Sequence, residues 1–110
     1  MLNIDKVTTV YLACGTTDLR KSIDGLTTIV QNQLKLDPFD NVLFVFCNKQ
    51  MNKLKILHFD EGFWLYYFRL EHSHFKWPMT KEALKVNKEE LKCSGTQFDP
   101  AIVSIFLQMR

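Results

Sequence analysis

Hydrophobic residues follow two different spacings in the first part of the chain. Val7 to Cys14 is a run of β-branched, aromatic and aliphatic residues that ends at Gly15, which predicts a strand followed by a turn. After that turn, aliphatic residues recur every three or four positions from Leu19 to Leu34, which predicts a long amphipathic helix with one buried stripe. Pro38 disfavours helical geometry in the residue before it, so we expect the helix to end there.

The middle of the chain is dominated by β-forming residues. Three apolar runs follow one another, separated by a polar stretch and by the tight Asp60-Glu61-Gly62 turn: 42–47, 54–59 and 63–70. A last short strand is expected at 74–77, where Pro78 interrupts it. Loops this short join neighbouring strands in antiparallel pairs, so the pattern predicts a meander whose apolar face the long helix covers.

The remainder of the chain carries weaker signals. Leu84 to Val86 is compatible with a small strand, and a short helix is expected between Asn87 and Gly95. Asp99 then precedes Pro100 at the expected start of a C-terminal helix. The fold class predicted is therefore α+β: an antiparallel β-meander covered by one long N-terminal helix, with short C-terminal helices. We expect one domain over 1–110, with its core at about 7–78 and an extension at 79–110.

Composition narrows the class of protein. The 110 residues suit one domain, and 46% hydrophobic residues are enough for a core. A net charge of +2 is too small to identify a nucleic-acid binder by itself. The segment from Lys49 to Lys81 nevertheless holds six Lys and Arg residues against three acidic ones, which predicts a mild basic patch.

Cysteine usage and the absence of long apolar runs bear on the compartment. The three cysteines are far apart and form no Cys-x-x-Cys pair, which favours a reducing cytosol over a disulfide framework. The first residues lack the apolar stretch of a signal peptide, and no run is long enough for a membrane-spanning helix. We expect a cytoplasmic protein with no membrane partner.

The turn from Gly15 to Asp18 lies between a strand and a helix, where many phosphate sites are built. Its single glycine fits neither a P-loop nor a dinucleotide-binding fingerprint. Arg20 and Lys21 fall in the predicted first helical turn, where the helix dipole disfavours cations, so they are candidates for binding an anion or a partner. The alternative is local pairing, with Arg20 bound to Asp24 and Asp18 bound to Lys21.

Basic residues alternate with aromatic ones on the predicted strands. Lys53, Lys55, Arg69 and Lys76 share this segment with several Trp and Tyr residues. Such a surface can bind nucleic acid through phosphate contacts and base stacking. The alternative is the ordinary solvated face of a sheet. Exposure of Trp64, Tyr66 or Tyr67 beside the lysines would favour the nucleic-acid interface.

Catalytic and metal chemistry have little support in the sequence. Cys14 lies near cationic residues, but no histidine can be placed beside it from sequence, and a cysteine that ends an apolar strand is commonly a small buried hydrophobe. His72 and His74 would share one strand face, yet a zinc site needs further ligands at suitable spacing. We predict no catalytic residues, no metal and no cofactor.

Ordered blocks along the chain resemble one family, the accessory proteins encoded by the second open reading frame (TnpB) of insertion-sequence-66 transposons. The blocks lie within about 7–78 and include Val10-Tyr11-Leu12-Ala13-Cys14-Gly15, Thr17-Asp18-Leu19-Arg20-Lys21, Asp24-Gly25-Leu26, Leu43-Phe44-Val45-Phe46, Leu54-Lys55-Ile56-Leu57, Gly62-Phe63, Arg69-Leu70-Glu71 and Phe75-Lys76-Trp77-Pro78. The resemblance implies a bacterial protein that assists a separately encoded transposase and has no established catalytic residues. Where that family commonly has an arginine-rich turn, this chain has Asn48 to Lys53, whose charge is diluted by Gln50 and Met51.

Together these observations predict a non-enzymatic accessory protein that assists transposition by binding the transposase of its element, DNA, or both. The alternative is a small cytosolic enzyme that uses Cys14 or the Gly15–Asp18 turn. The residues expected to bind the partner or the nucleic acid are Arg20, Lys21, Lys49, Lys53, Lys55, Arg69 and Lys76.

Overall fold

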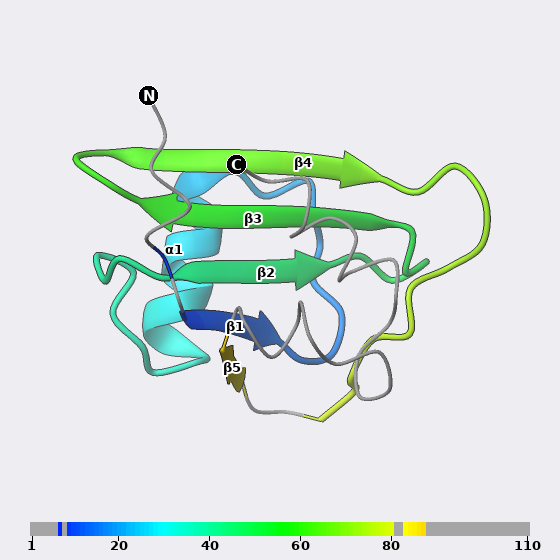
Figure 1. The fold of residues 1–110 in the computed structure, drawn as a ribbon, viewed down its shortest axis with the longest axis horizontal. Helices are drawn as coiled ribbons and strands as arrows, with labels where there is room; N and C mark the ends of the chain where they lie inside the picture. Colours follow the sequence, from blue (N-terminus) through cyan, green and yellow to red (C-terminus); the bar gives the residue numbers. More distant parts are fainter. Residues whose placement is uncertain (1–6, 8, 81–82, 88–110) are drawn as a thin grey trace.

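A computed structural model describes residues 7, 9–80 and 83–87 of the chain. These residues form a mixed five-stranded sheet with one helix packed on one of its faces (Figure 1). The elements in chain order are β1 (Thr9–Ala13), α1 (Ile23–Asn32), β2 (Leu43–Cys47), β3 (Lys53–Phe59), β4 (Phe63–Arg69) and β5 (Ala83–Asn87). The strand order across the sheet is β4-β3-β2-β1-β5. No helix in these described ranges is long and apolar enough to cross a membrane.

The sheet differs from the predicted meander at its first strand. Strands β2, β3 and β4 pair antiparallel through short turns, as predicted. Strand β1 pairs parallel with β2, with Val10 beside Leu43, and β5 pairs antiparallel with the other edge of β1. Parallel neighbours need a crossover connection, and the segment that contains α1 supplies it. The predicted fold class, a long helix over an antiparallel meander, is therefore wrong: the fold is a mostly β, mixed sheet with a short crossover helix.

The helix is shorter than its apolar stripe suggested, because both ends are fixed by local hydrogen bonds. Before it, a carboxylate oxygen of Asp18 accepts the backbone N–H of Arg20 at 3.0 Å, which makes a turn in place of a helical start. The helix begins only at Ile23. After it, Lys35 adopts a left-handed φ of 57°, and Leu36 N–H donates to the Val30 carbonyl, which turns the chain back over the last turn of the helix.

Two hydrophobic cores lie on the two faces of the sheet. On the helix side, Leu26 and Val30 pack with Phe44, Phe46 and Leu57. Leu19 and Leu34 also pack there although they lie outside the helix, so the predicted stripe identified the right side chains. On the opposite face, the core is completed by two aromatic residues from the segment that follows β4. Because it contributes to both cores, β2 is buried along its whole length.

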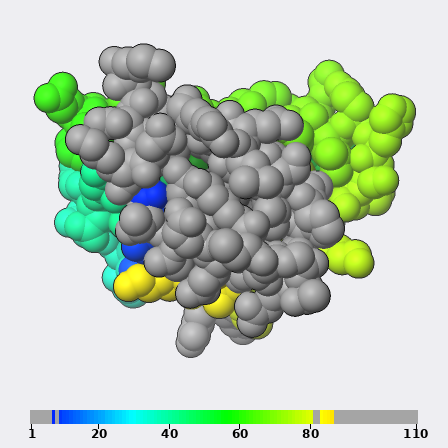
Figure 2. Space-filling view, in the orientation of Figure 1, coloured from blue at the N-terminus to red at the C-terminus, as the bar shows by residue number. Residues whose placement is uncertain are grey.

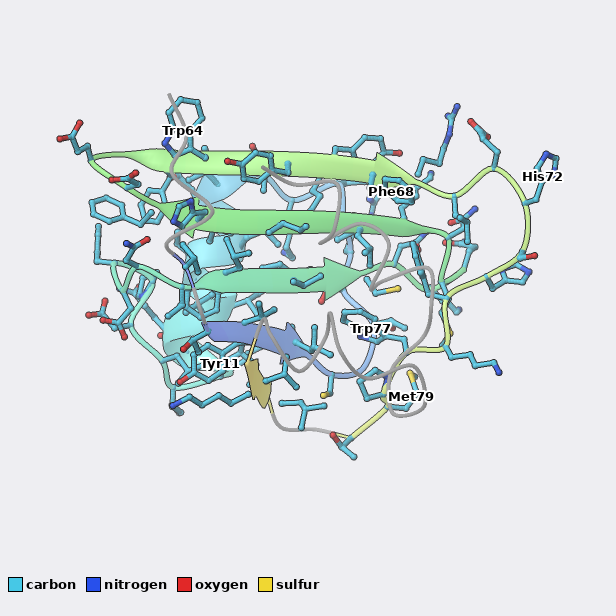
Figure 3. The ribbon with its side chains drawn as sticks, in the orientation of Figure 1. Tyr11, Trp64, Phe68, His72, Trp77 and Met79 are labelled. Atoms are coloured by element: carbon cyan, nitrogen blue, oxygen red, sulfur yellow. The ribbon has the colours of Figure 1, made fainter. Side chains whose placement is uncertain are left out.

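Those two aromatic residues, Phe75 and Trp77, come from the stretch where a last strand was predicted. The prediction of a strand at 74–77 is wrong: the segment crosses the sheet without pairing as a strand. Phe75 and Trp77 are 2% and 6% exposed, and the Trp77 indole N–H donates to the Ala13 carbonyl at 3.0 Å (Figure 3). The predicted small strand at 84–86 is confirmed as part of β5. The short C-terminal helices expected between Asn87 and the last residue lie almost entirely outside the described residues.

Candidate nucleic-acid interface

A groove of about 690 Å³ lies at the end of the sheet where β1 and β2 finish and β3 begins. One wall is the loop after β1, the other is the turn between β2 and β3, and the floor is formed by side chains of β3 and β4. We call it the basic groove. It is lined by Thr16, Thr17, Asp18, Leu19, Arg20, Asn48, Lys49, Gln50, Lys53, Lys55 and Tyr67.

The first wall is held against the sheet by its backbone. Gly15, at a φ of 79° that suits glycine, donates its N–H to the Pro78 carbonyl at 2.8 Å. Thr17 N–H donates to the carbonyl of Cys47, the last residue of β2, at 2.8 Å. These bonds place the Thr16–Arg20 loop beside the end of β2.

Asp18 and Arg20 form a two-pronged ion pair on this wall. Arg20 Nη2 donates to Asp18 Oδ2 at 2.7 Å and Nε to Oδ1 at 3.0 Å. The Arg20 guanidinium beside it holds the pKa of the Asp18 carboxyl well below its usual range. The pairs expected from helical spacing, Arg20 with Asp24 and Asp18 with Lys21, are wrong. Asp18, Arg20 and Lys21 precede the helix, which begins at Ile23, and Arg20 pairs with Asp18 instead.

The second wall is a turn organised by the side chain of Asn48, which is 7% exposed. Its amide oxygen accepts the backbone N–H groups of Asn52 and Lys53 at 3.0 and 2.9 Å. Its amide nitrogen donates to the side chains of Gln50 and Asn52 at 3.1 and 2.7 Å. A single buried asparagine therefore fixes the turn that carries Lys49, a role that the sequence analysis did not assign to it.

The floor brings basic and aromatic side chains together. Lys55 lies directly opposite Tyr67, and Lys53 lies directly opposite Arg69. Residues two apart on a strand share a face, so all four lie on one side of the β3–β4 hairpin. The Tyr67 side chain is 56% exposed. This is the exposed aromatic residue beside lysines that would favour a nucleic-acid interface.

The other two aromatic residues weighed with Tyr67 do not join the groove. Trp64 is 46% exposed, but it lies opposite His58, near the start of β4 and so at the far end of the hairpin (Figure 3). Tyr66 is half-buried and packs against the core on the face away from the helix. Burial raises the pKa of the Tyr66 hydroxyl.

The predicted binding residues separate into three groups. Arg20, Lys49, Lys53 and Lys55 line the basic groove. Arg69 adjoins it through Lys53 and is paired with Glu71 at 2.7 Å. Lys21 and Lys76 are exposed and lie outside the set of lining residues, although the Lys21 carbonyl accepts a 2.9 Å hydrogen bond from Lys55 Nζ. The backbone of Lys21 thus helps to hold Lys55 in place.

The segment after β4 supports both walls from behind. Phe75 N–H donates to the Met51 carbonyl at 2.6 Å, and His74 Nδ1 lies 2.9 Å from the Gln50 carbonyl oxygen. Pro78 bonds the first wall through Gly15, as described above. In Figures 1 and 2 the residues that follow β4, in yellow-green, form the right-hand edge of the molecule, the end at which β2 finishes. The geometry of the groove therefore depends on this segment.

The alternative site at Cys14 has no comparable organisation. The Cys14 thiol donates a long 3.6 Å contact to the Leu12 carbonyl. His58 is buried near the opposite end of the sheet, 2.6 Å from the side-chain oxygen of Asn41. Burial raises the pKa of the other described thiol, Cys47, to about 12. Within 7, 9–80 and 83–87, no three His, Cys, Asp or Glu side chains are grouped as metal ligands would be.

Comparison with known proteins identifies the family of this chain. A family model described as "IS66 Orf2 like protein" matches residues 8–101. The chain belongs to this family. The match continues well beyond Pro78, where the resemblance between individual blocks ended. As an IS66 Orf2-like protein, it is an accessory protein of an insertion sequence.

One curated relative of this IS66 Orf2-like protein is the uncharacterized protein y4hO of Sinorhizobium fredii. The two are 40% identical over 70 residues, which cover 63% of this chain and 61% of the relative. The match therefore spans less than two thirds of the relative's own length. No solved structure matches this chain.

Proposed function

We propose that this IS66 accessory protein assists transposition by binding DNA through the basic groove. The observation that carries the proposal is the convergence of Arg20, Lys49, Lys53 and Lys55 around one recess, with Asp18 as its lining carboxylate. Lysine and arginine bind DNA mainly by neutralising backbone phosphates. A protein with a net charge of only +2 lacks a strong overall field, so the local concentration of cations matters more than the total.

The number of cations sets the expected strength and salt dependence of binding. Each neutralised phosphate contributes about −0.7 to −0.9 to the slope of log affinity against log salt concentration. Three or four contacts give a slope of about −3 and the modest affinity typical of non-specific binding. Fluorescence anisotropy with DNA from the ends of the insertion sequence, repeated over a series of salt concentrations, measures both quantities. Absence of binding at low salt would refute the proposal.

Asp18 provides a variant that should strengthen binding. Asp18→Asn removes a negative charge from the groove and releases Arg20, whose side chain is 90% exposed, toward phosphate. We expect the affinity for DNA to rise about three- to tenfold at low salt. Anisotropy titrations at low and at moderate salt test this, and the gain should shrink as salt screens the charges. A loss of affinity in this variant would mean that the ion pair, rather than the free cation, shapes the binding surface.

The low pKa of Asp18 also sets the direction in which pH changes the stability that the Asp18–Arg20 pair contributes. Because the folded-state pKa lies below that of the unfolded chain, the pair's contribution to stability is present above the unfolded pKa and is lost as pH falls through the folded value. The pair is exposed, so this contribution is small. Asp18 therefore stays ionised at neutral pH, and its effect on binding is tested by substitution rather than by titration.

A second surface favours contact with the transposase. At the opposite end of the sheet, Phe39 packs against Phe59 and Phe63 with ring centroids 5.1 and 5.4 Å apart, yet Phe39 is 55% exposed. Four acidic residues belong to the loop of Phe39 and to the β3–β4 turn: Asp37, Asp40, Asp60 and Glu61. An exposed aromatic cluster with acidic neighbours suits a basic, DNA-binding partner. We propose the transposase of the same element as that partner.

Phe39→Ala tests this second surface. We expect the variant to lose co-purification with the transposase of its own element by about tenfold or more, because exposed aromatic anchors dominate interface energies. Trp64→Ala is the matched control, since Trp64 is another exposed aromatic residue of the same hairpin end. Equal recovery of transposase with wild type and Phe39→Ala would exclude this surface. DNA binding through the basic groove would be unaffected by that result.

A further inference from the structure

Tyr67 stands out because its exposure contrasts with that of its neighbour on the same face. Two residues earlier on β4, Leu65 packs into the helix-side core, whereas Tyr67 is 56% exposed on the floor of the basic groove. Helix α1 contributes no residue to the groove lining. The Tyr67 ring therefore lies on a part of this sheet face that helix α1 does not line.

The surroundings of Tyr67 are positively charged on its own sheet face. Lys55 lies directly across from it on β3, Lys53 is the diagonal neighbour, and Arg69 follows two residues later on β4. Lys53 and Lys55 share the groove lining with the ring, and Lys55 is anchored by its bond to the Lys21 carbonyl. An aromatic face is thus bordered by groups that bind phosphate, the combination found in single-strand binding sites.

We propose that Tyr67 is a stacking platform for an unpaired base, so that the basic groove takes single-stranded DNA in preference to a duplex. This inference rests on the proposed DNA-binding function. In a duplex, each base is covered on both faces by its neighbours, and a ring on the floor of a walled groove cannot reach it. A base in a single strand, a frayed end or an extruded nucleotide presents a free face. The lysines would hold the phosphates on either side of the stacked base.

Sequence preference is expected to be weak. Stacking is open to every base, because every base has an aromatic face. The two amide side chains of the groove lining, Asn48 and Gln50, are bonded to each other at 3.1 Å and so are engaged within the turn. The recognised feature is therefore the unpaired state of the DNA rather than its sequence.

The test compares an oligothymidylate with a blunt duplex of equal length, by fluorescence anisotropy at low salt. We expect wild type to prefer the single strand. Tyr67→Ala should lower single-strand affinity by about five- to a hundredfold, the range measured when a stacking aromatic residue is truncated. Tyr67→Phe should keep the wild-type affinity, because stacking uses the ring. Trp64→Ala is the matched control, an exposed aromatic residue on the same strand that does not line the groove.

A second readout reports stacking directly. The fluorescence of 2-aminopurine placed in the single strand should be quenched by wild type and by Tyr67→Phe, and should recover with Tyr67→Ala. Circular dichroism confirms that each variant is folded. Salt-dependent binding of both DNAs that is unchanged by Tyr67→Ala would overturn the stacking inference and leave the basic groove as a phosphate site. An equal loss in Tyr67→Phe would also overturn it, since the hydroxyl would then be the group that binds. No binding of either DNA would overturn the proposed function itself.

Discussion

Replacing Lys49, Lys53 and Lys55 together with alanine should lower the affinity for DNA by about a hundredfold at low salt. The three residues supply most of the cations that line the basic groove. Removing three phosphate contacts should also make the slope of log affinity against log salt less negative by about two to three. Both quantities come from one set of anisotropy titrations.

Two further variants separate the role of charge from that of structure. Lys85→Ala removes an exposed lysine of β5, which lies beside Tyr11 and outside the groove lining, and should leave affinity near that of wild type. The double variant Lys49→Ala, Lys53→Ala keeps the bond from Lys55 Nζ to the Lys21 carbonyl. It should show about two thirds of the change in slope. If Lys85→Ala lowered the affinity for DNA as much as the removal of one groove lysine does, DNA would be bound by the general positive charge of the protein and not by the groove.

Trp77→Ala should have the largest effect on stability, a loss of about 3–5 kcal/mol in the free energy of unfolding. The indole is 6% exposed within the core on the face away from the helix. Its removal leaves a cavity and also deprives the Ala13 carbonyl of its 3.0 Å hydrogen bond. Denaturant unfolding followed by circular dichroism measures the loss. Since small domains are stable by about 5–15 kcal/mol, the variant should unfold at much lower denaturant.

The same substitution should weaken DNA binding while the protein is still folded. Trp77 belongs to the segment whose Phe75 and Pro78 hold the two walls of the basic groove through Met51 and Gly15. Trp77→Phe keeps most of the buried ring and should lose a smaller part of the stability. A change below about 1 kcal/mol in Trp77→Ala would show that this segment is not a structural support.

Strands and turns of the fold were predictable because their signals are local. The apolar, β-forming runs, the Asp60–Gly62 turn and the polar stretch from Asn48 predict β2, β3 and β4 at nearly their observed positions. The helix was predicted too long because hydrophobic periodicity reports which side chains are buried, and not which backbone is helical. Leu19 and Leu34 reach the helix-side core from outside the helix. The features that shorten the helix are the hydrogen bond to the Asp18 side chain and the left-handed backbone of Lys35, neither of which the periodicity encodes.

The parallel pairing of β1 with β2 could not be read from the same signals. Both strands are apolar, and a run of this kind has no feature that distinguishes a parallel from an antiparallel neighbour. The crossover through a helix permits parallel pairing, and the short-loop argument applies only from β2 onward. The segment around Trp77 was misassigned for a related reason. Alternating aromatic residues are typical of a strand, but here they fill the core from a segment that crosses the sheet.

The sequence predicted the chemistry of the candidate site, a combination of basic and aromatic side chains, better than it predicted which residues line the groove. Lys53, Lys55 and Tyr67 share a face because strand register sets them opposite one another, and register follows from the hairpin turn. The presence of Arg20 and Lys49 in the same groove depends on the tertiary placement of two loops. Phe39 had no signal in the sequence, since a single aromatic residue after Pro38 has no period that indicates a surface cluster.

The most direct test of the central claim is the slope of log affinity against log salt concentration for DNA bound to the wild-type protein. Binding through the cations of the basic groove predicts a slope between about −2 and −4, made less negative by the triple lysine variant and unchanged by Lys85→Ala. Absence of binding at low salt, or a slope near zero, would contradict it.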